Sequence, residues 1–389
     1  MSSSLDQKML MLVFLIAAPL CVVGQGTTNV GVYKWSLSNA NKYTNIGDGY
    51  ITKASSDSSG KKVVVVCDNK GIIVSSDYGA TFAQSAYDAD LQAWSPEWES
   101  VASSDDGQVL LASGEKWSMP LYKSADGGAT WTLTHTDNKN DGYDNVAVSG
   151  SGTSLMAYSD AFYSSSNSGT SWSPTAFASG AYSNSIAFGA TDQIMFVCTT
   201  SGVFFSGDAG VSVKSIYSER CDNMAVSRNG NHIVINSGGP VVTSHDGGTN
   251  WVTKSFLDVT GVTTNSNNGW KDLAISDDGQ TICAANEWKG VFISTDGGLT
   301  KYNKAPLSDS VHTPTTSSGE PRWRMCTLSG DGETIVVGTA GTIKIGRLVS
   351  SLNPTSPSPS KSTSTGSGTG SGTSSSGTTP SSAGTSGPR

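Results

Sequence analysis

The segment SADGGATW at residues 124–131 is repeated, with small changes, at five other places in the chain. Each copy follows the pattern Ser-x-Asp-x-Gly-x-Thr-Trp, and successive copies begin 38 to 50 residues apart. The other copies are SSDYGATF (75–82), SSNSGTSW (165–172), SGDAGVSV (206–213), SHDGGTNW (244–251) and STDGGLTK (294–301). We call these six segments the boxes. A unit of about 44 residues therefore recurs through most of the sequence.

A second signature lies upstream of the boxes. It consists of two apolar stretches joined by a short polar turn, as in VASSDDGQVLLA (101–112). The seven copies of this hairpin lie at 54–66, 101–112, 146–157, 186–197, 224–235, 273–284 and 326–337. Repeats of this length that contain several short strands are typical of β-propellers. The sequence therefore predicts an all-β fold, a seven-bladed β-propeller of four-stranded blades over residues 25–350.

The seventh hairpin has no box after it, because the last repeat ends as GTIKIGRL (341–348). An extra strand-like segment, NVGVYKWSLS (29–38), precedes the first repeat. We expect this N-terminal strand to complete and close the last blade, since closing the ring removes open sheet edges.

The boxes resemble the Asp-box repeats of sialidases, of other glycan-cleaving propellers, of sorting receptors and of photosystem assembly factors. The resemblance covers nearly all of residues 45–345. In such a box the Asp side chain accepts hydrogen bonds from backbone N–H groups of its own tight turn, and the Gly permits the turn. The Thr and Trp pack the hairpin against its blade. We therefore expect structural, not catalytic, roles for Asp77, Asp126, Asn167, Asp208, Asp246 and Asp296.

The two ends differ from the repeats. Residues 1–24 are typical of a secretory signal peptide, since Lys8 precedes an apolar run that is shorter than the roughly 20 residues of a spanning helix. Residues 351–389 are almost entirely Ser, Thr, Gly and Pro, which predicts a disordered tail. We expect a secreted protein, of the kind associated with a cell wall or surface, and no membrane span after cleavage of the signal.

The composition excludes several classes of protein. The 389 residues carry a net charge of −8, and only 14% of them are charged. Coiled coils and multispanning membrane proteins need a different composition. The acidic balance argues against nucleic-acid binding. No metal-binding or cofactor motif is present, and we expect a monomer with neither metal nor cofactor. Cys198 and Cys221 lie in neighbouring repeats and could pair, but buried free thiols are the favoured interpretation, because a domain of this size does not need disulfides.

The resemblance implies that the box joins the third and fourth strands of a blade and shares a face, the box face, with the turn between the first and second strands. The opposite face, here called the loop face, carries the loops that lead into each blade and the turns between the second and third strands. These segments vary most in length and chemistry, and the resemblance implies that ligands bind there.

Aromatic residues on the loop face suggest a carbohydrate ligand, because sugar rings stack on aromatic planes. An aromatic recurs before the first strand of most blades, at Tyr50, Trp98, Tyr143, Tyr182, Trp270 and Trp323. These rings either cap the inner strands or form stacking platforms. Three others lie in loops outside the pattern. The predicted ligand-binding residues are Trp94, Trp98, Trp117, Trp270, Trp288, Trp323, Arg322 and Arg324.

The principal hypothesis is therefore a secreted propeller that binds extracellular or cell-wall glycans. An alternative is a glycoside hydrolase or polysaccharide lyase, for which the candidate catalytic residues are Glu115, Asp160, Asp222 and Glu287. A sialidase is disfavoured, because only Arg220, Arg322 and Arg324 could reach the ligand face and the early segment VYKWSLS has a Lys in place of the family's Arg. A further alternative is a non-enzymatic scaffold with a protein partner.

Overall fold

The structure is a computed structural model. It describes residues 33–38, 51–68, 71–85, 97–114, 120–135, 142–177, 182–255, 269–300, 302–307, 322–339 and 341–349. The chain divides into two units, Met1–Leu352 and Asn353–Arg389, and every described residue belongs to the first. The predicted signal peptide (1–24) and tail (351–389) lie outside the described residues. Within the described ranges, no helix has the length and apolar character needed to cross a membrane.

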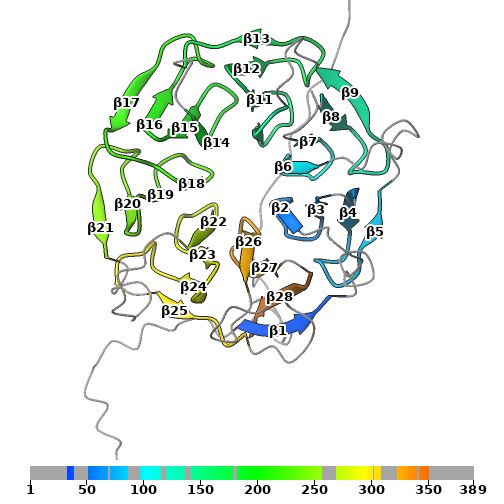
Figure 1. Ribbon diagram of the computed structural model, residues 1–389, viewed down its shortest axis with the longest axis vertical. Helices are drawn as coiled ribbons and strands as arrows, with labels where there is room; N and C mark the ends of the chain where they lie inside the picture. Colours follow the sequence, from blue (N-terminus) through cyan, green and yellow to red (C-terminus); the bar gives the residue numbers. More distant parts are fainter. Residues whose placement is uncertain are drawn as a thin grey trace, which may run out of the picture. The chain divides into compact units, whose positions relative to one another are not determined.

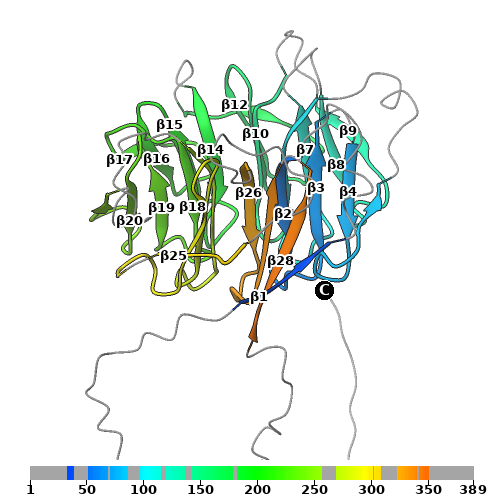
Figure 2. The ribbon, with the colours of Figure 1, turned by 60° about the horizontal axis from the view of Figure 1, so that its bottom comes forward.

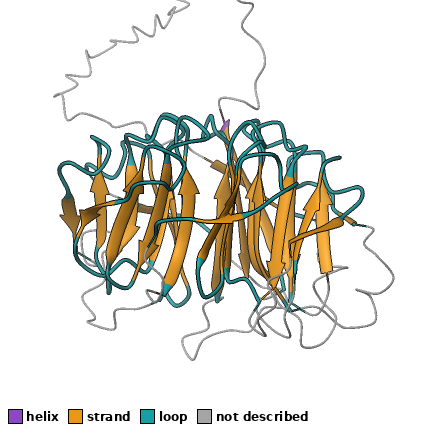
Figure 3. Cartoon of the chain, turned by 90° about the horizontal axis from the view of Figure 1, so that it is seen from above, coloured by secondary structure: helices purple, strands orange, loops and turns teal. Residues whose placement is uncertain are grey.

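The described residues form seven four-stranded antiparallel sheets. The first strand of each sheet contacts the first strands of the sheets on either side, and these contacts run once around a ring. Figure 1 shows the sheets arranged around the centre as blades, and Figure 3 shows their strands standing side by side between two layers of loops. The prediction of a seven-bladed all-β propeller is confirmed.

Blades 1 to 6 each take four consecutive strands. The strands of blades 1 to 3 are β2 (Ile51–Ser56), β3 (Val63–Cys67), β4 (Gly71–Ser75), β5 (Ala83–Gln84), β6 (Trp98–Ser103), β7 (Leu110–Gly114), β8 (Leu121–Ser124), β9 (Thr132–His135), β10 (Asn145–Val148), β11 (Leu155–Tyr158), β12 (Phe162–Ser165) and β13 (Ser173–Pro174). The strands of blades 4 to 6 are β14 (Ser183–Phe188), β15 (Met195–Thr199), β16 (Gly202–Ser206), β17 (Lys214–Tyr217), β18 (Asn223–Val226), β19 (Ile233–Asn236), β20 (Val241–Ser244), β21 (Val252–Lys254), β22 (Trp270–Ile275), β23 (Ile282–Asn286), β24 (Gly290–Ser294) and β25 (Asn303–Lys304).

Blade 7 joins the two ends of the propeller. It comprises β26 (Trp323–Leu328), β27 (Thr334–Thr339), β28 (Ile343–Leu348) and, as its outermost strand, β1 (Tyr33–Leu37). Tyr33 pairs with Leu348 and Leu37 with Lys344. The Tyr33 hydroxyl also donates a 2.5 Å hydrogen bond to the carbonyl oxygen of Gly332. Figure 2 shows β1 beside β28. The predicted closure by the N-terminal strand is therefore confirmed.

The hydrophobic core lies between successive blades. All five residues of β3 are buried, and Val64 and Val66 pack with Trp98, Val101 and Leu110 of blade 2. Because a blade is covered on both faces, the second strands, such as β3 and β15, are buried on both sides rather than alternating. Burial between blades thus explains the continuous apolar runs that follow each hairpin turn.

Each box forms a tight turn held by its own side chains. In the first box, Asp77 Oδ1 accepts a 2.8 Å hydrogen bond from the Thr81 amide, and Ser75 Oγ accepts one of 2.8 Å from Gly79 N. Equivalent side-chain acceptors at Asp126, Asn167, Asp208, Asp246 and Asp296 bind the amide four residues further on. These side chains lie on the box face, since each box follows the third strand.

The box aromatic connects neighbouring blades. Trp131 Nε1 donates to Ser85 Oγ of blade 1 (2.8 Å), and Trp251 Nε1 donates to the Ile216 carbonyl oxygen of blade 4 (2.9 Å). These two indoles thus contact the outer part of the preceding blade, and Trp251 Nε1 also donates to the Gly248 carbonyl oxygen of its own box (3.1 Å).

Cys198 of β15 and Cys221 form a disulfide between blades 4 and 5. The favoured interpretation of this pair as free thiols was wrong, because the neighbouring repeats bring the two Cα atoms to 5.4 Å. Cys67, Cys283 and Cys326 are free and buried.

Candidate functional site

A β-bulge recurs near the start of the first strand in five blades. In blade 2, Trp98 pairs with Gly114 and Ser100 with Ser113, so Glu99 is the extra residue. The extra residues of the five bulges are Thr52, Glu99, Asn184, Lys271 and Arg324. A bulge redirects side chains and is frequent next to binding and active sites. These bulges therefore mark the loop-face end of the central channel as a candidate site.

A cavity of about 260 Å³ lies at this end of the channel. Its walls come from the first strands of blades 1 to 6, or from residues just before them. The lining residues are Thr52, Lys53, Glu99, Ser100, Asp144, Asn145, Tyr182, Ser183, Asn184, Asn223 and Lys271. Ten of the eleven carry amide, hydroxyl, carboxylate or ammonium groups on aliphatic stems, and the other is a tyrosine. The cavity is therefore strongly polar, and its volume is slightly below the usual range of roughly 300–1,000 Å³ for ligand sites.

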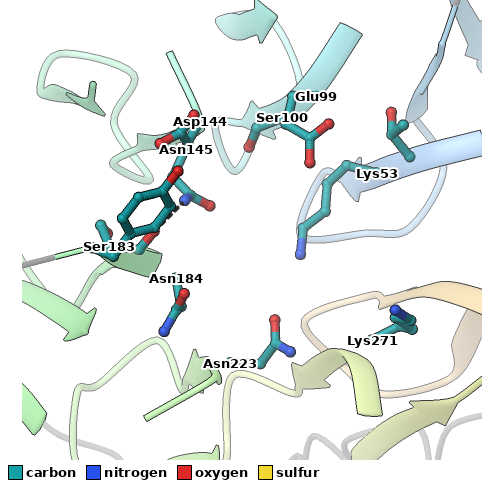
Figure 4. Close-up of a pocket in the computed structure, with 11 residues that line it drawn as sticks. Lys53, Glu99, Ser100, Asp144, Asn145, Ser183, Asn184, Asn223 and Lys271 are labelled. Carbon is teal, nitrogen blue, oxygen red and sulfur yellow. Dashed lines mark hydrogen bonds between the residues drawn. The ribbon is translucent and has the colours of Figure 1, made fainter. Parts of the chain in front are cut away.

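Figure 4 shows where the charged groups and the amides of the lining lie around the cavity. Glu99 and Asp144, from the adjacent blades 2 and 3, lie along the upper edge of the view, and Asn184 and Asn223 lie along the lower edge. Lys53 and Lys271 lie at the right. The two carboxylates thus share one side of the cavity with Ser100 and Asn145, while two further amides lie on another side and the two ammonium groups on a third.

Both lysines of the cavity are held by buried carboxylates. Lys53 Nζ lies 2.5 Å from Asp272 Oδ1, and Lys271 Nζ lies 3.1 Å from Glu287 Oε2. Burial by itself would lower the pKa of Lys53, but the Asp272 carboxylate outweighs burial and holds that pKa above its usual value. Lys53 is therefore positively charged throughout the physiological pH range.

Tyr182 is the exposed aromatic ring of the cavity, at 64% exposure. The register explains why it differs from the other recurring aromatics. In blade 4 the residue paired just before the bulge is Ser183, which is buried, whereas in blade 2 it is Trp98. Tyr182 precedes the core position by one residue, and a shift of one residue turns a side chain to the other face of a strand.

The opposite end of the channel is spanned by the turns between first and second strands. Their backbones form a chain of hydrogen bonds, including Ser58 N to Asp105 O (2.9 Å) and Asp105 N to Gly150 O (3.0 Å). Arg228 of blade 5 forms an ion pair with Asp105 of blade 2 across this end. The box-face end of the channel is therefore crossed by an ion pair, and the cavity lies at the other end.

Trp98, Trp270 and Trp323 are packed in the core, with exposures of 0%, 4% and 1%. The indole of Trp270 also donates a hydrogen bond to the Gly239 carbonyl oxygen. The structure therefore corrects their assignment as stacking platforms: apolar burial between blades covers both faces of each ring. Trp94 and Trp117 lie outside the described residues.

Trp288 is exposed on the loop face, and the Arg322 guanidinium carbon lies 4.8 Å from the centre of its ring. This cation–π pair joins the β23–β24 turn of blade 6 to the residue before β26. Arg324 is the bulged residue of blade 7 and is not part of the cavity lining. The structure thus brings Trp288 and Arg322 together, and neither residue lines the cavity.

The candidate catalytic carboxylates are on three different blades and have different partners. Asp160 of blade 3 accepts a hydrogen bond from Ser159 Oγ, Asp222 before β18 pairs with Arg220, and Glu287 of blade 6 pairs with Lys271. Glu115 lies outside the described residues. None of the three described candidates lines the cavity.

Sequence reasoning did not single out Lys53, Asn145, Asn184, Asn223 and Lys271. A usable signal was present, because Glu99, Asp144, Lys271 and Arg324 each directly follow a recurring aromatic. Glu99 and Asp144 are not among the four carboxylates that the sequence analysis selects as catalytic candidates.

The described residues contain no group of three or more His, Cys, Asp and Glu side chains that could hold a metal ion. Two histidines do meet on the box-face side of blade 5, where His232 Nδ1 and His245 Nδ1 lie 2.9 Å apart.

Comparisons with known proteins show the fold and not the activity. No family model matches the sequence, and no curated protein matches it. Among solved structures, YCF48 bound to a D1 peptide matches with TM-score 0.56 and 17% identity, over 80% of this chain and 96% of that one. A GH74 xyloglucanase from Xanthomonas campestris matches with TM-score 0.62 and 16% identity, over 82% of this chain and 54% of the enzyme.

The chain therefore spans about half the length of that enzyme. U3-55K also has a similar structure, with TM-score 0.60, 12% identity, and coverage of 80% of this chain and all of U3-55K. The seven-bladed architecture and these neighbours fit a propeller of the Asp-box kind. Since proteins with different names share the fold, function has to be argued from the site.

Proposed function

We propose that this protein is a secreted propeller that binds extracellular or cell-wall glycans in the cavity on its loop face. The observation that carries the proposal is the combination of one exposed ring, Tyr182, with a wall of amides, hydroxyls and carboxylates. Sugars need both kinds of contact, since their C–H faces stack on aromatic planes and their hydroxyls both donate and accept hydrogen bonds.

The size of the cavity also favours this ligand class. About 260 Å³ is room for one or two sugar units rather than a folded partner, so the cavity would hold the end or a short branch of a chain. The rest of the chain would extend over the loop face, where Trp288 offers a second exposed ring. The xyloglucanase, of which 54% is matched by this chain, adds support for a glycan as the ligand.

The test is binding to a panel of polysaccharides and oligosaccharides by the purified protein, with Tyr182→Ala as the variant. Tyr182→Phe is the matched control, because it keeps the ring and loses only the hydroxyl. We expect binding to be lost in Tyr182→Ala and kept in Tyr182→Phe. Glycan binding that is equally strong in Tyr182→Ala would show that the cavity is not the binding site.

A second candidate is a glycoside hydrolase, because two carboxylates from adjacent blades, Glu99 and Asp144, line one cavity. Mass spectrometry of the same incubations separates the two functions. Released fragments that disappear in Asp144→Asn would identify an enzyme. Retention of the protein on a glycan without fragments would identify a binding module, and binding of a defined protein with no glycan affinity would identify a scaffold.

A further inference from the structure

Trp288 and Arg322 form a cation–π pair on the loop face, outside the lining of the cavity. The guanidinium carbon lies 4.8 Å from the centre of the indole ring, and Trp288 is still 40% exposed. Arg322 is itself partly exposed. A guanidinium that stacks on a ring keeps its N–H groups available, because they lie in the plane of the group and point away from the ring. The pair therefore offers an apolar surface beside a set of hydrogen-bond donors.

The cations beside this ring have no carboxylate partner in the described part of the chain. No described Asp or Glu forms an ion pair with Arg322 or with Lys289, the residue that follows Trp288. Arg322 Nε is also buried and has no acceptor among the described residues. Three other cations of the loop face do pair with carboxylates: Lys53, Lys271 and Arg220. Since a donor without an acceptor is costly, Arg322 is the group of this face that gains most from an acceptor on a ligand.

Asn286 holds the turn that carries Trp288. It is 1% exposed, and its Oδ1 accepts hydrogen bonds of 3.1 Å from the amides of both Trp288 and Lys289. Its Nδ2 is buried and has no hydrogen-bond partner among the described residues. The amide lies beside the indole, since a Cβ atom at Gly269 would be 3.0 Å from Asn286 Nδ2 and 2.5 Å from Trp288 Cδ1. A second buried donor without an acceptor thus lies next to the ring, and the turn is fixed before any ligand binds.

The Trp288 turn is joined to the wall of the cavity. Glu287, the residue before Trp288, binds Lys271 of the cavity lining at 3.1 Å. The lining itself contains the carboxylates of Glu99 and Asp144, which repel an anionic group. A carboxylate on the ligand is therefore disfavoured in the cavity and favoured beside Trp288, where the cations are unpaired.

Building on the glycan-binding function proposed above, we infer that Trp288 and Arg322 form a second subsite, which binds a uronic acid unit of the glycan. The sugar ring stacks on Trp288, and the carboxylate accepts two parallel N–H groups of Arg322, a geometry that suits the planar guanidinium. Lys289 adds a positive charge, and the neutral units of the chain occupy the cavity. Because the protein carries a net charge of −8, the subsite suits isolated uronic acid units and not a dense polyanion.

The test uses short oligosaccharides that contain one galacturonate, glucuronate or mannuronate unit, together with the methyl ester of each. The ester keeps the sugar ring and removes only the charge. Binding to the full chain is measured by calorimetry. We expect at least one uronate oligosaccharide to bind about tenfold more tightly than its ester, because a charge-assisted contact is lost in the ester. This preference should shrink as salt is added.

Variants of the pair assign the preference to the subsite. Arg322→Gln should abolish the preference for the acid and leave the affinity for the esters unchanged, whereas Arg322→Lys should retain part of it, since lysine keeps the charge but not the planar group. Trp288→Ala should weaken the binding of acids and esters alike. Arg347→Gln is the matched control, because Arg347 stacks on Tyr78 at 4.2 Å but lies at the first box, where it donates to the Asp77 carbonyl oxygen. It should change neither affinity.

The outcomes separate this inference from the function on which it rests. If acids and esters bind equally well, or if the preference for the acid survives in Arg322→Gln, the uronate subsite is overturned and glycan binding stands. If Tyr182→Ala has no effect while Arg322→Gln abolishes the preference, the subsite stands and the cavity is not the binding site. If no oligosaccharide binds, or if only an oligoglutamate peptide binds, both proposals are overturned. Thermal melting of each variant checks that it is folded.

Discussion

The carboxylate of Asp272 binds Lys53, and yet the two residues belong to blades 6 and 1, which blade 7 separates in the ring. The second oxygen of the same carboxylate accepts a 3.1 Å hydrogen bond from the Cys326 amide of blade 7. One buried side chain therefore ties together three successive blades at the place where the ring closes.

Removing the cation of this pair should destabilise the protein. Lys53→Met leaves Asp272 charged and buried without its partner, and we expect a loss of about 2 kcal/mol, less than for a fully buried pair because the Lys53 side chain is 34% exposed. Urea unfolding measures the change. In a double-mutant cycle, Lys53→Met with Asp272→Asn should cost less than the sum of the single variants, and simple additivity would contradict the coupling.

The disulfide between blades 4 and 5 should contribute measurably to stability. It closes a loop with a sequence separation of 23 residues, which in the chain-entropy description corresponds to about 3 kcal/mol. We expect the double variant Cys198→Ala and Cys221→Ala to lose about that much in denaturant unfolding. Cys67→Ala provides the control for a buried thiol. Native alkylation should leave Cys67 unmodified, since burial raises the pKa of its thiol to about 12.

Two boxes should make the protein sensitive to acid. Hydrogen bonds from the Ser212 side chain and amide lower the pKa of Asp208 to about 2, and those from the Asn250 amide and side chain do the same for Asp246. A carboxylate with a folded pKa below its unfolded value stabilises the folded state above the unfolded pKa, and that stability is lost as the pH falls from about 4 to about 2.

The third box provides a natural reference, because Asn167 forms the same turn without an ionisable group. Asp208→Asn should therefore keep the turn and reduce the change in melting temperature between pH 5 and pH 2.5. An unchanged acid profile in Asp208→Asn would contradict the assignment.

The histidine pair predicts a second pH dependence. Burial and the neighbouring His232 lower the pKa of His245 below 6.5, and Asp246 and Asp296 oppose this effect more weakly. A histidine with a lowered folded pKa binds protons more readily when unfolded, so stability is complete above about pH 6.5 and declines as the pH falls below it. We expect His232→Gln to reduce the loss of melting temperature between pH 7.5 and pH 5. An equal loss of melting temperature in the wild-type protein and in His232→Gln would contradict this role of the histidine pair.

The fourth position of each box has a left-handed backbone, and three boxes fill it with a residue other than glycine. The φ angles are 64° at Tyr78, 52° at Ser168 and 59° at Ala209, whereas the equivalent Gly127, Gly247 and Gly297 have 71°, 68° and 67°. Left-handed backbone costs roughly 1 kcal/mol for a residue with a Cβ atom. Ala209→Gly should therefore raise the free energy of unfolding by about 0.5 kcal/mol, because relief of the backbone strain is partly offset by the loss of one methyl group. Gly247→Ala should lower the free energy of unfolding by about 1 kcal/mol.

The repeat made the fold predictable from sequence. Boxes and hairpins fix the number of blades, and the absence of a seventh box indicated where the N-terminal strand pairs, as Tyr33 and Leu348 do. Local turn chemistry determines these features, and local chemistry is visible in the sequence.

The site was harder to predict, because it depends on register. Trp98 and Tyr182 occupy similar places in the repeat, but the bulge assigns the buried position to Trp98 in blade 2 and to Ser183 in blade 4. Lys53 is held by a carboxylate two blades away. This pairing depends on the closure of the ring, and no local pattern in the sequence indicates it.

The pairing of β1 with β28 has a consequence for biosynthesis. The two partners of the Tyr33–Gly332 hydrogen bond are separated by 299 residues. At roughly 5–20 residues per second, the ribosome needs about 15–60 s to make the intervening chain. During that interval β1 exists as an unpaired strand beside growing blades, and the last blade can form only when β28 has been translated. Until β1 and β28 pair, the exposed edge of β1 is therefore the place where a nascent chain is most open to pairing with a second copy of itself.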